Sequence, residues 1–102
     1  MKRQRPRETA VVNRIVARLK QLPAVVVRKR HGTAMGVAGD PDLYGSFRGR
    51  HFEIEVKVQN DPASQLTKLQ AHRIQEWKQA GAITGVARTP EEAIAILTAS
   101  EF

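Results

Sequence analysis

The strongest constraint on the fold is a strand pattern over residues 51–58, in which apolar and charged side chains alternate. Apolar side chains would share one face of this strand: Phe52, Ile54, Val56 and Val58. Charged side chains would share the other: Glu53, Glu55 and Lys57. Two interpretations fit this pattern. Either the strand is half-exposed and its charged face meets solvent, or Glu55 and Lys57 line a site opposite the turn at Pro41 and Asp42.

The rest of the chain predicts an α/β domain. Apolar residues at helical spacing indicate a helix over residues 8–21. Capping and stop signals predict a second helix that begins at Asp61, Pro62 or Ser64 and ends at residue 79, and a third over residues 90–99. Strands are expected at residues 24–29, 42–47, 51–58 and 83–87. This α-β-β-β-α-β-α order predicts one domain, residues 1–102, with a mixed four-stranded sheet flanked by helices.

The charge of the chain indicates its class of partner. Seventeen Lys and Arg residues against ten Asp and Glu residues give a net charge of +7, so nucleic acid is the expected partner. No stretch is apolar enough to span a membrane, and the apolar run at residues 24–27 is too short for a signal peptide. The absence of cysteine excludes disulfides and thiolate metal sites. We therefore expect a cytoplasmic protein without a membrane partner.

Residues 1–7 are expected to form a loose basic arm. It contains Lys2, Arg3, Arg5 and Arg7. Such a segment is either a solvated tail or an arm that lies on DNA phosphates, and the sequence supports both equally. If it binds DNA, Arg14 of the first helix would add to the same basic surface.

Gln70 is unusual because it lies on the apolar face of the second predicted helix, with Leu66, Ile74 and Trp77. A glutamine that points inward must find polar partners, or burying it costs about 1–3 kcal/mol. The sequence therefore predicts another polar group opposite Gln70.

Asp42, Glu55, Lys57 and Gln70 together predict a metal-dependent site for phosphodiester cleavage. Asp42 would enter from one hairpin strand, and Glu55 and Lys57 from one face of its partner. Two carboxylates suit Mg²⁺, which keeps several of its waters, and a nearby lysine can stabilise charge on the phosphoryl oxygens. A Glu-x-Lys motif alone is weak, but the upstream Pro-Asp pair and the inward glutamine make the combination more specific.

Three motifs resemble the VRR-NUC branch of the PD-(D/E)xK nucleases. They are G-x-P-D-L at residues 39–43, E-V-K at residues 55–57 and L-T-K-L-Q at residues 66–70. The resemblance covers nearly the whole chain. It implies a restriction-endonuclease-like core, which agrees with the element order predicted above.

The resemblance also implies roles for individual residues. Asp42 and Glu55 would bind Mg²⁺, for which Mn²⁺ can substitute, and the main-chain carbonyl of Val56 would be a further ligand. Lys57 would be the catalytic lysine, and Gln70 would complete the site.

Two further acidic residues have a structural and a functional interpretation. Glu8 would match an acidic residue that related enzymes carry on their first helix, but the helix dipole alone favours a carboxylate in a first turn. Asp40 occupies the variable position of the motif and is interpreted as a turn residue. For Glu8, the two interpretations stay equally open.

The remaining residues that often bind metals or bases do not form a second site. His31, His51 and His72 share no ligand spacing, so they are interpreted as loop or surface residues. Phe52 and Trp77 lie on apolar faces, which favours core packing over stacking on bases.

The family resemblance implies a function for the whole chain. Stand-alone copies of the domain are similar to small phage and bacterial proteins that act on branched DNA as dimers. We therefore expect a Mg²⁺-dependent endonuclease that acts as a homodimer on four-way (Holliday) junctions or similar DNA, in DNA repair. The alternatives are a non-catalytic DNA-binding module and a nuclease subunit that needs a partner protein. Ile94, Leu97 and exposed parts of the first helix are candidates for the dimer surface.

Overall fold

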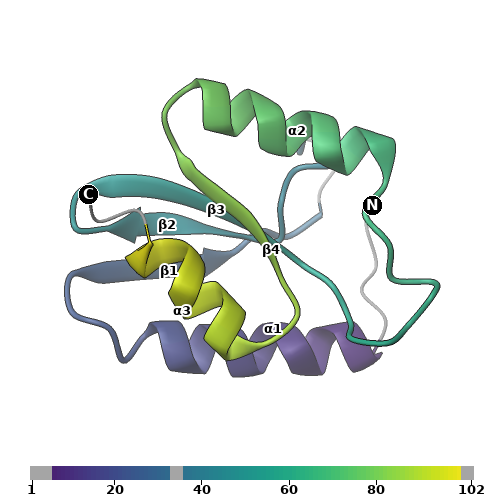
Figure 1. The fold of residues 1–102 in the computed structure, drawn as a ribbon, viewed down its shortest axis with the longest axis horizontal. Coiled ribbons are helices and arrows are strands. Elements are labelled where there is room, and N and C mark those ends of the chain that lie inside the picture. Colours follow the sequence, from purple (N-terminus) through teal and green to yellow (C-terminus); the bar gives the residue numbers. More distant parts are fainter. Residues whose placement is uncertain (1–5, 33–35, 100–102) are drawn as a thin grey trace.

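The computed structural model describes residues 6–32 and 36–99, and it confirms the predicted order of elements (Figure 1). The elements are α1 (Pro6–Leu19), β1 (Val25–Lys29), β2 (Leu43–Phe47), β3 (Arg50–Val56), α2 (Lys68–Gln79), β4 (Ile83–Ala87) and α3 (Pro90–Thr98). The proposed arm residues Lys2, Arg3 and Arg5 lie outside the described residues. Among the described residues, no helix combines the length and apolar character needed to cross a membrane.

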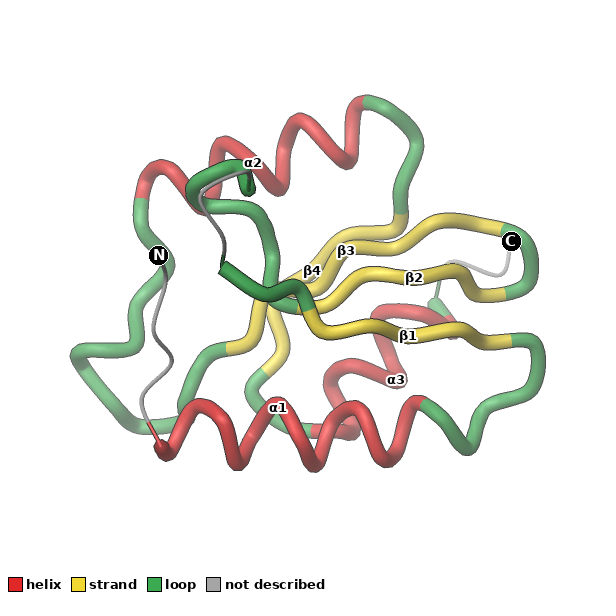
Figure 2. The backbone as a smooth tube through the Cα atoms, turned by 180° about the vertical axis from the view of Figure 1, so that it is seen from behind, coloured by secondary structure: helices red, strands yellow, loops and turns green. Residues whose placement is uncertain are grey.

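The four strands form one mixed sheet in the order β1-β2-β3-β4 (Figure 2). The first three are antiparallel, and β3 pairs with β4 in parallel through the α2 crossover. Arg48 and Gly49 connect β2 to β3 with φ angles of 52° and 83°. Two consecutive positive φ values are typical of the tight turn whose twist matches a hairpin. The predicted hairpin is therefore confirmed.

The helices divide between the two faces of the sheet. Figure 1 shows α2 on one face and α1 with α3 on the other. The apolar core lies between the sheet and the α1–α3 layer, and its fully buried members include Ile15, Leu19, Phe52, Ile54 and Leu97. Phe52 is thus a core residue, as predicted.

The expected dimer surface on α3 is wrong for Leu97. This side chain is fully buried, and Ile94 is partly buried against the same core. Because α3 packs against both β4 and α1, its apolar side chains are used inside the domain.

The charged face of β3 is buried. Glu53 and Glu55 are fully buried, and Lys57, just after the strand, is 6% exposed. β3 is a central strand, and α2 lies over the face that carries these residues (Figure 1). The interpretation of β3 as a half-exposed strand with a wet polar face is therefore wrong.

The predicted start of the second helix is also wrong. α2 begins at Lys68 with Thr67 as its N-cap. Asp61 instead accepts hydrogen bonds from the main-chain N–H groups of Ala63 and Ser64, which forms a local turn. The Ser64 hydroxyl accepts from the Val58 N–H at 2.8 Å, so Ser64 anchors this loop to the end of β3.

The predicted buried face of this helix is correct for one residue only. Gln70 is the buried residue of α2, whereas Ile74 and Trp77 are partly buried. Leu66 is 38% exposed because it precedes the helix. α2 therefore covers the polar face of the sheet mainly with polar contacts.

Candidate active site

Asp42 lies at the start of β2, opposite Glu55. Leu43 pairs with Ile54 in the antiparallel register, so the next positions outward are Asp42 and Glu55. Directly opposed residues place their side chains on the same face of a sheet. Asp42 Oδ2 accepts a hydrogen bond from the Val56 N–H at 2.9 Å, and the carboxylate is nearly buried. The predicted hairpin geometry therefore brings the two carboxylates together.

Glu55 is held by two neighbours on the same face. Its Oε2 accepts a hydrogen bond from Gln70 Nε2 at 3.0 Å and lies 3.5 Å from Lys57 Nζ. Gln70 therefore points inward to a polar partner, as its position predicted. Lys57 also holds β4, because its main-chain N–H donates to the Ala87 carbonyl at 3.0 Å.

A capping box fixes the orientation of the Gln70 carboxamide. Gln70 Oε1 accepts from the Thr67 N–H at 3.0 Å, while the Thr67 hydroxyl accepts from the Gln70 N–H at 3.1 Å. With its oxygen occupied in this way, the carboxamide presents its NH₂ group to Glu55. The start of α2 thereby places a donor on the carboxylate.

A cleft of about 380 Å³ opens beside these residues. Its walls come from residues 30–32 and 36–42 and from the start of α2, and both Asp42 and Gln70 line it. Glu55 and Lys57 are not among its lining residues. Gln70 contacts Glu55 directly, so it links the cleft to the buried pair.

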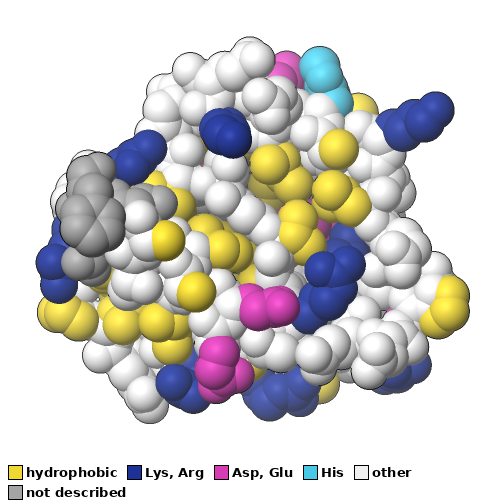
Figure 3. All heavy atoms as spheres, in the orientation of Figure 1, with side chains coloured by type: hydrophobic (Ala, Val, Ile, Leu, Met, Phe, Trp, Pro, Cys, Tyr) yellow, Lys and Arg dark blue, Asp and Glu magenta, His cyan; other side chains and the backbone are white. Residues whose placement is uncertain are grey.

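One face of the molecule carries scattered positive charge. Figure 3 shows Lys and Arg side chains spread over one face, with hydrophobic side chains between them. Large apolar side chains that are exposed include Val37, Leu66 and Leu69, and both Val37 and Leu69 line the cleft. Apolar and polar side chains therefore both line the cleft.

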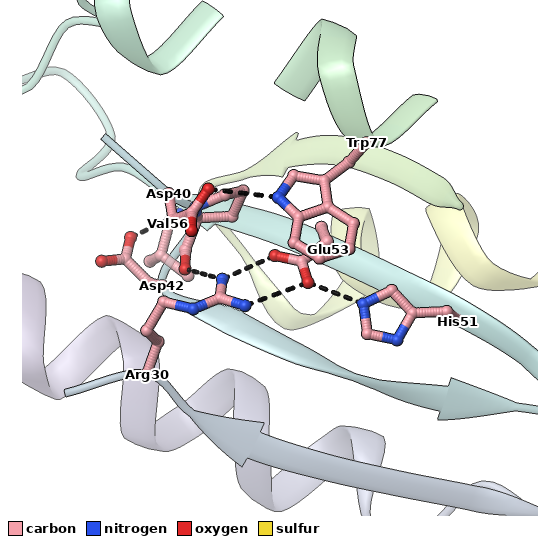
Figure 4. Close-up of polar contacts among 8 residues, drawn as sticks. Arg30, Asp40, Asp42, His51, Glu53, Val56 and Trp77 are labelled. Atoms are coloured by element: carbon pink, nitrogen blue, oxygen red, sulfur yellow. Dashed lines mark hydrogen bonds and ion pairs between the residues drawn. The ribbon is translucent and has the colours of Figure 1, made fainter. Parts of the chain in front are cut away.

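An ion-pair network that the sequence did not reveal is centred on Glu53 (Figure 4). Arg30 donates to both oxygens of Glu53, at 2.6 and 3.1 Å, and to the Pro41 carbonyl at 2.8 Å. His51 Nε2 donates to Glu53 at 2.7 Å. The sequence indicated only that Glu53 shares a face of β3 with Glu55, two residues later.

Aromatic rings surround this network. The Arg30 guanidinium lies 4.6 Å from the centre of the Tyr44 ring and 5.8 Å from that of Trp77. Trp77 Nε1 donates to Asp40 at 3.1 Å, so Asp40 also connects the turn to α2 (Figure 4). Burial lowers the pKa of Arg30, but the hydrogen bonds and charge of Glu53 outweigh this, and the pKa is raised above its usual value.

The other sequence candidates lie outside this cluster of contacts. Glu8 is buried in the first turn of α1, and its role stays a prediction. Arg7 is exposed and forms a loose ion pair with Asp61 at 3.7 Å. Arg14 is exposed on α1. Neither arginine is part of the cleft wall.

The donor set fits a magnesium ion that keeps much of its water. Among residues 6–32 and 36–99, no group of three or more His, Asp or Glu side chains is placed to hold a metal. Mg²⁺ is commonly bound by one or two carboxylates together with waters and substrate phosphate. Asp42 and Glu55 would be the carboxylate ligands of such an ion. The Val56 carbonyl, which the family resemblance implies as a further ligand, belongs to the residue whose N–H donates to Asp42.

Comparison with known proteins gives structural matches only. Neither the protein-family models nor the curated proteins match the chain. A solved structure described as a VRR_NUC domain is 23% identical, with a TM-score of 0.70, and the match covers 94% of this chain and 98% of that one. The fold is that of a VRR_NUC domain. A second solved structure, described as a VRR_NUC domain protein, is 22% identical, with a TM-score of 0.71. That match covers 97% of this chain and 91% of that one.

The VRR_NUC fold accounts for the arrangement described above. Both matches cover nearly the full length of each chain, so α1, the sheet, α2 and α3 are all included. The predicted α/β fold, a mixed four-stranded sheet flanked by helices, is therefore confirmed and matches the VRR_NUC structures.

Proposed function

We propose that this chain is a Mg²⁺-dependent endonuclease that hydrolyses phosphodiester bonds in DNA. One observation carries the proposal: the turn before β2, the end of β3 and the start of α2 converge on a buried Asp42–Glu55–Lys57–Gln70 cluster. The VRR_NUC fold supports the proposal. The four residues of the cluster also belong to the three sequence motifs that resemble the VRR-NUC nucleases.

Each residue of the cluster would have a distinct role in the reaction. Asp42 and Glu55 would hold the metal, which when bound polarises the scissile phosphate and activates a water. Lys57 would offset the negative charge that builds on the phosphoryl oxygens. Gln70 would keep the Glu55 carboxylate oriented through its 3.0 Å hydrogen bond.

The proposed substrate is branched DNA, including four-way junctions, cut by a homodimer. One cluster per chain would cleave one strand, and resolving a junction takes two symmetric cuts, which two-fold symmetry supplies. A net charge of +7 per chain favours binding to several phosphate backbones without reading base sequence.

The direct test is incubation of purified protein with supercoiled plasmid, linear duplex and a four-way junction. We expect cleavage with Mg²⁺ or Mn²⁺, no cleavage with Ca²⁺ or a chelator, and a preference for the junction. Asp42→Asn protein purified in parallel controls for contaminating nucleases. DNA binding without cleavage under every metal condition would contradict the proposal and support the non-catalytic or partner-dependent alternative.

A further inference from the structure

Arg30 holds two consecutive carbonyl groups of the turn that carries Asp42. Its side-chain Nη1 donates to the Pro41 carbonyl at 2.8 Å. Its main-chain N–H donates to the Asp42 carbonyl at 2.7 Å. Arg30 therefore hydrogen-bonds to the main chain on both sides of the Asp42 Cα. Arg30 directly follows β1 and lines the cleft.

The Arg30 side chain is itself held in place. Its guanidinium forms a two-pronged ion pair with Glu53, and Glu53 is fully buried on the central strand. His51 donates to the same carboxylate, and the rings of Tyr44 and Trp77 lie near the guanidinium. A planar guanidinium held by two parallel hydrogen bonds and by aromatic rings has little freedom to move.

We propose that Arg30 is a positioning residue that fixes the Asp42 carboxylate for metal binding, with Glu53 as the anchor that holds Arg30. This inference rests on the proposed function, because it assigns Asp42 to the metal. Arg30 acts through the Pro41 and Asp42 main chain and does not touch the reacting groups.

Arg30 also lines the cleft, so the competing role is that of a phosphate ligand. Nη1 already donates to Glu53 and to Pro41, and Nη2 donates to Glu53. The buried carboxylate of Glu53 offsets the positive charge. An arginine that captures DNA phosphate would instead keep its paired donors available for the ligand. The contacts favour positioning over phosphate binding.

A second competing role is purely structural, in which Arg30 only neutralises the buried Glu53. The double variant Arg30→Met with Glu53→Gln separates these roles. Removing one partner leaves a buried charge, whereas removing both charges restores stability. The double variant lacks the hydrogen bond to Pro41, so it should recover the melting temperature without recovering metal binding.

The experiment measures Mn²⁺ binding to the protein without DNA, by electron paramagnetic resonance, for the wild type, Arg30→Met, Glu53→Gln and the double variant. Arg28→Met is the matched control: it removes the same charge two residues earlier from an exposed side chain that touches neither Pro41 nor Glu53. Partners that orient a metal ligand typically contribute 10–100-fold in metal affinity. We expect such a loss in the double variant, with a melting temperature near that of the wild type, and no loss in Arg28→Met.

Cleavage kinetics give a second readout. If Arg30 positions Asp42, the double variant should have a lower kcat and need more Mg²⁺, and its KM for DNA should stay within about twofold of the wild type. For a phosphate contact, KM for DNA should rise and the salt slope of binding decrease by about one.

If the double variant bound Mn²⁺ as tightly as the wild type, the positioning role of Arg30 would be overturned. The nuclease assignment would stay intact. A wild type that neither binds Mn²⁺ nor cleaves DNA would overturn both. The two failures are therefore distinguishable.

Discussion

Two buried carboxylates on one face of β3 are each matched by a cation. Glu55 lies 3.5 Å from Lys57, and Glu53 is paired with Arg30. Breaking a buried ion pair by removing one partner costs about 3–5 kcal/mol, because it leaves an uncompensated charge. Such pairs contribute little stability compared with an apolar core. The proposed function would account for their presence on a central strand, because both pairs belong to the proposed site or hold it in place.

Lys57→Ala should lower the single-turnover cleavage rate by roughly two orders of magnitude or more, because it removes the cation that would offset transition-state charge in the proposed mechanism. DNA affinity should change little. Lys68→Ala, which removes an exposed lysine at the start of α2, is the control for charge alone. If Lys57→Ala changed only the salt dependence of binding, Lys57 would be a phosphate-binding residue instead.

Gln70→Ala should reduce cleavage by less than Lys57→Ala does, because Glu55 keeps its lysine but loses the hydrogen bond that orients it. Gln70→Glu should be worse than Gln70→Ala, since it places a second carboxylate against Glu55. Single-turnover rates at saturating Mg²⁺ measure both effects. Equal cleavage rates for Gln70→Ala and Gln70→Glu would contradict the role of Gln70 in orienting Glu55.

At the scale of elements, the start of α2 links helix capping to the site. Thr67 caps the helix and, through the capping box, holds the Gln70 carboxamide toward Glu55. The orientation of the Gln70 carboxamide toward Glu55 therefore depends on where the helix begins.

Thr67→Ala tests whether the cap of α2 positions Gln70, and the same substitution at Thr89, the N-cap of α3, is the control. The Thr89 hydroxyl likewise accepts a hydrogen bond at a helix start, from the Glu92 N–H at 3.1 Å, and its helix, α3, is in the other helix layer. Each substitution should lower the free energy of unfolding by about 1 kcal/mol. Only Thr67→Ala should also slow cleavage. Equal activity of both variants, measured at a temperature where both are folded, would show that capping does not position Gln70.

The sequence was sufficient for features that depend on local pattern. The alternation of apolar and charged residues predicted β3, and the predicted hairpin placed Asp42 close to Glu55, as the observed register does. The start of α2 was missed because Asp61 and Ser64 suit a turn as well as a cap, and contacts with β3 decide between them. The Arg30–Glu53 pair joins residues 23 positions apart across three strands, so no local pattern indicated it. The catalytic roles of the site residues stay predictions.

At the scale of the whole molecule, the high positive charge and small size determine how DNA would be held. The affinity for a four-way junction should fall steeply between low and physiological salt and depend little on base sequence. Light scattering at micromolar concentration should give the mass of a dimer. A monomer that cuts linear duplex as readily as junctions would contradict the paired-cut proposal and leave the nuclease assignment unchanged.

The most direct test of the central claim is the nicking rate of supercoiled plasmid in Mg²⁺ for the wild type, Asp42→Asn and Glu55→Gln, with DNA affinity measured in Ca²⁺. Both substitutions keep the size of the side chain and remove a carboxylate. We predict that nicking is lost while DNA is bound at least as tightly as by the wild type, because each substitution removes a negative charge near the phosphates that the site would hold. Undiminished nicking by Glu55→Gln, with contaminating nucleases excluded, would contradict the assignment of the site.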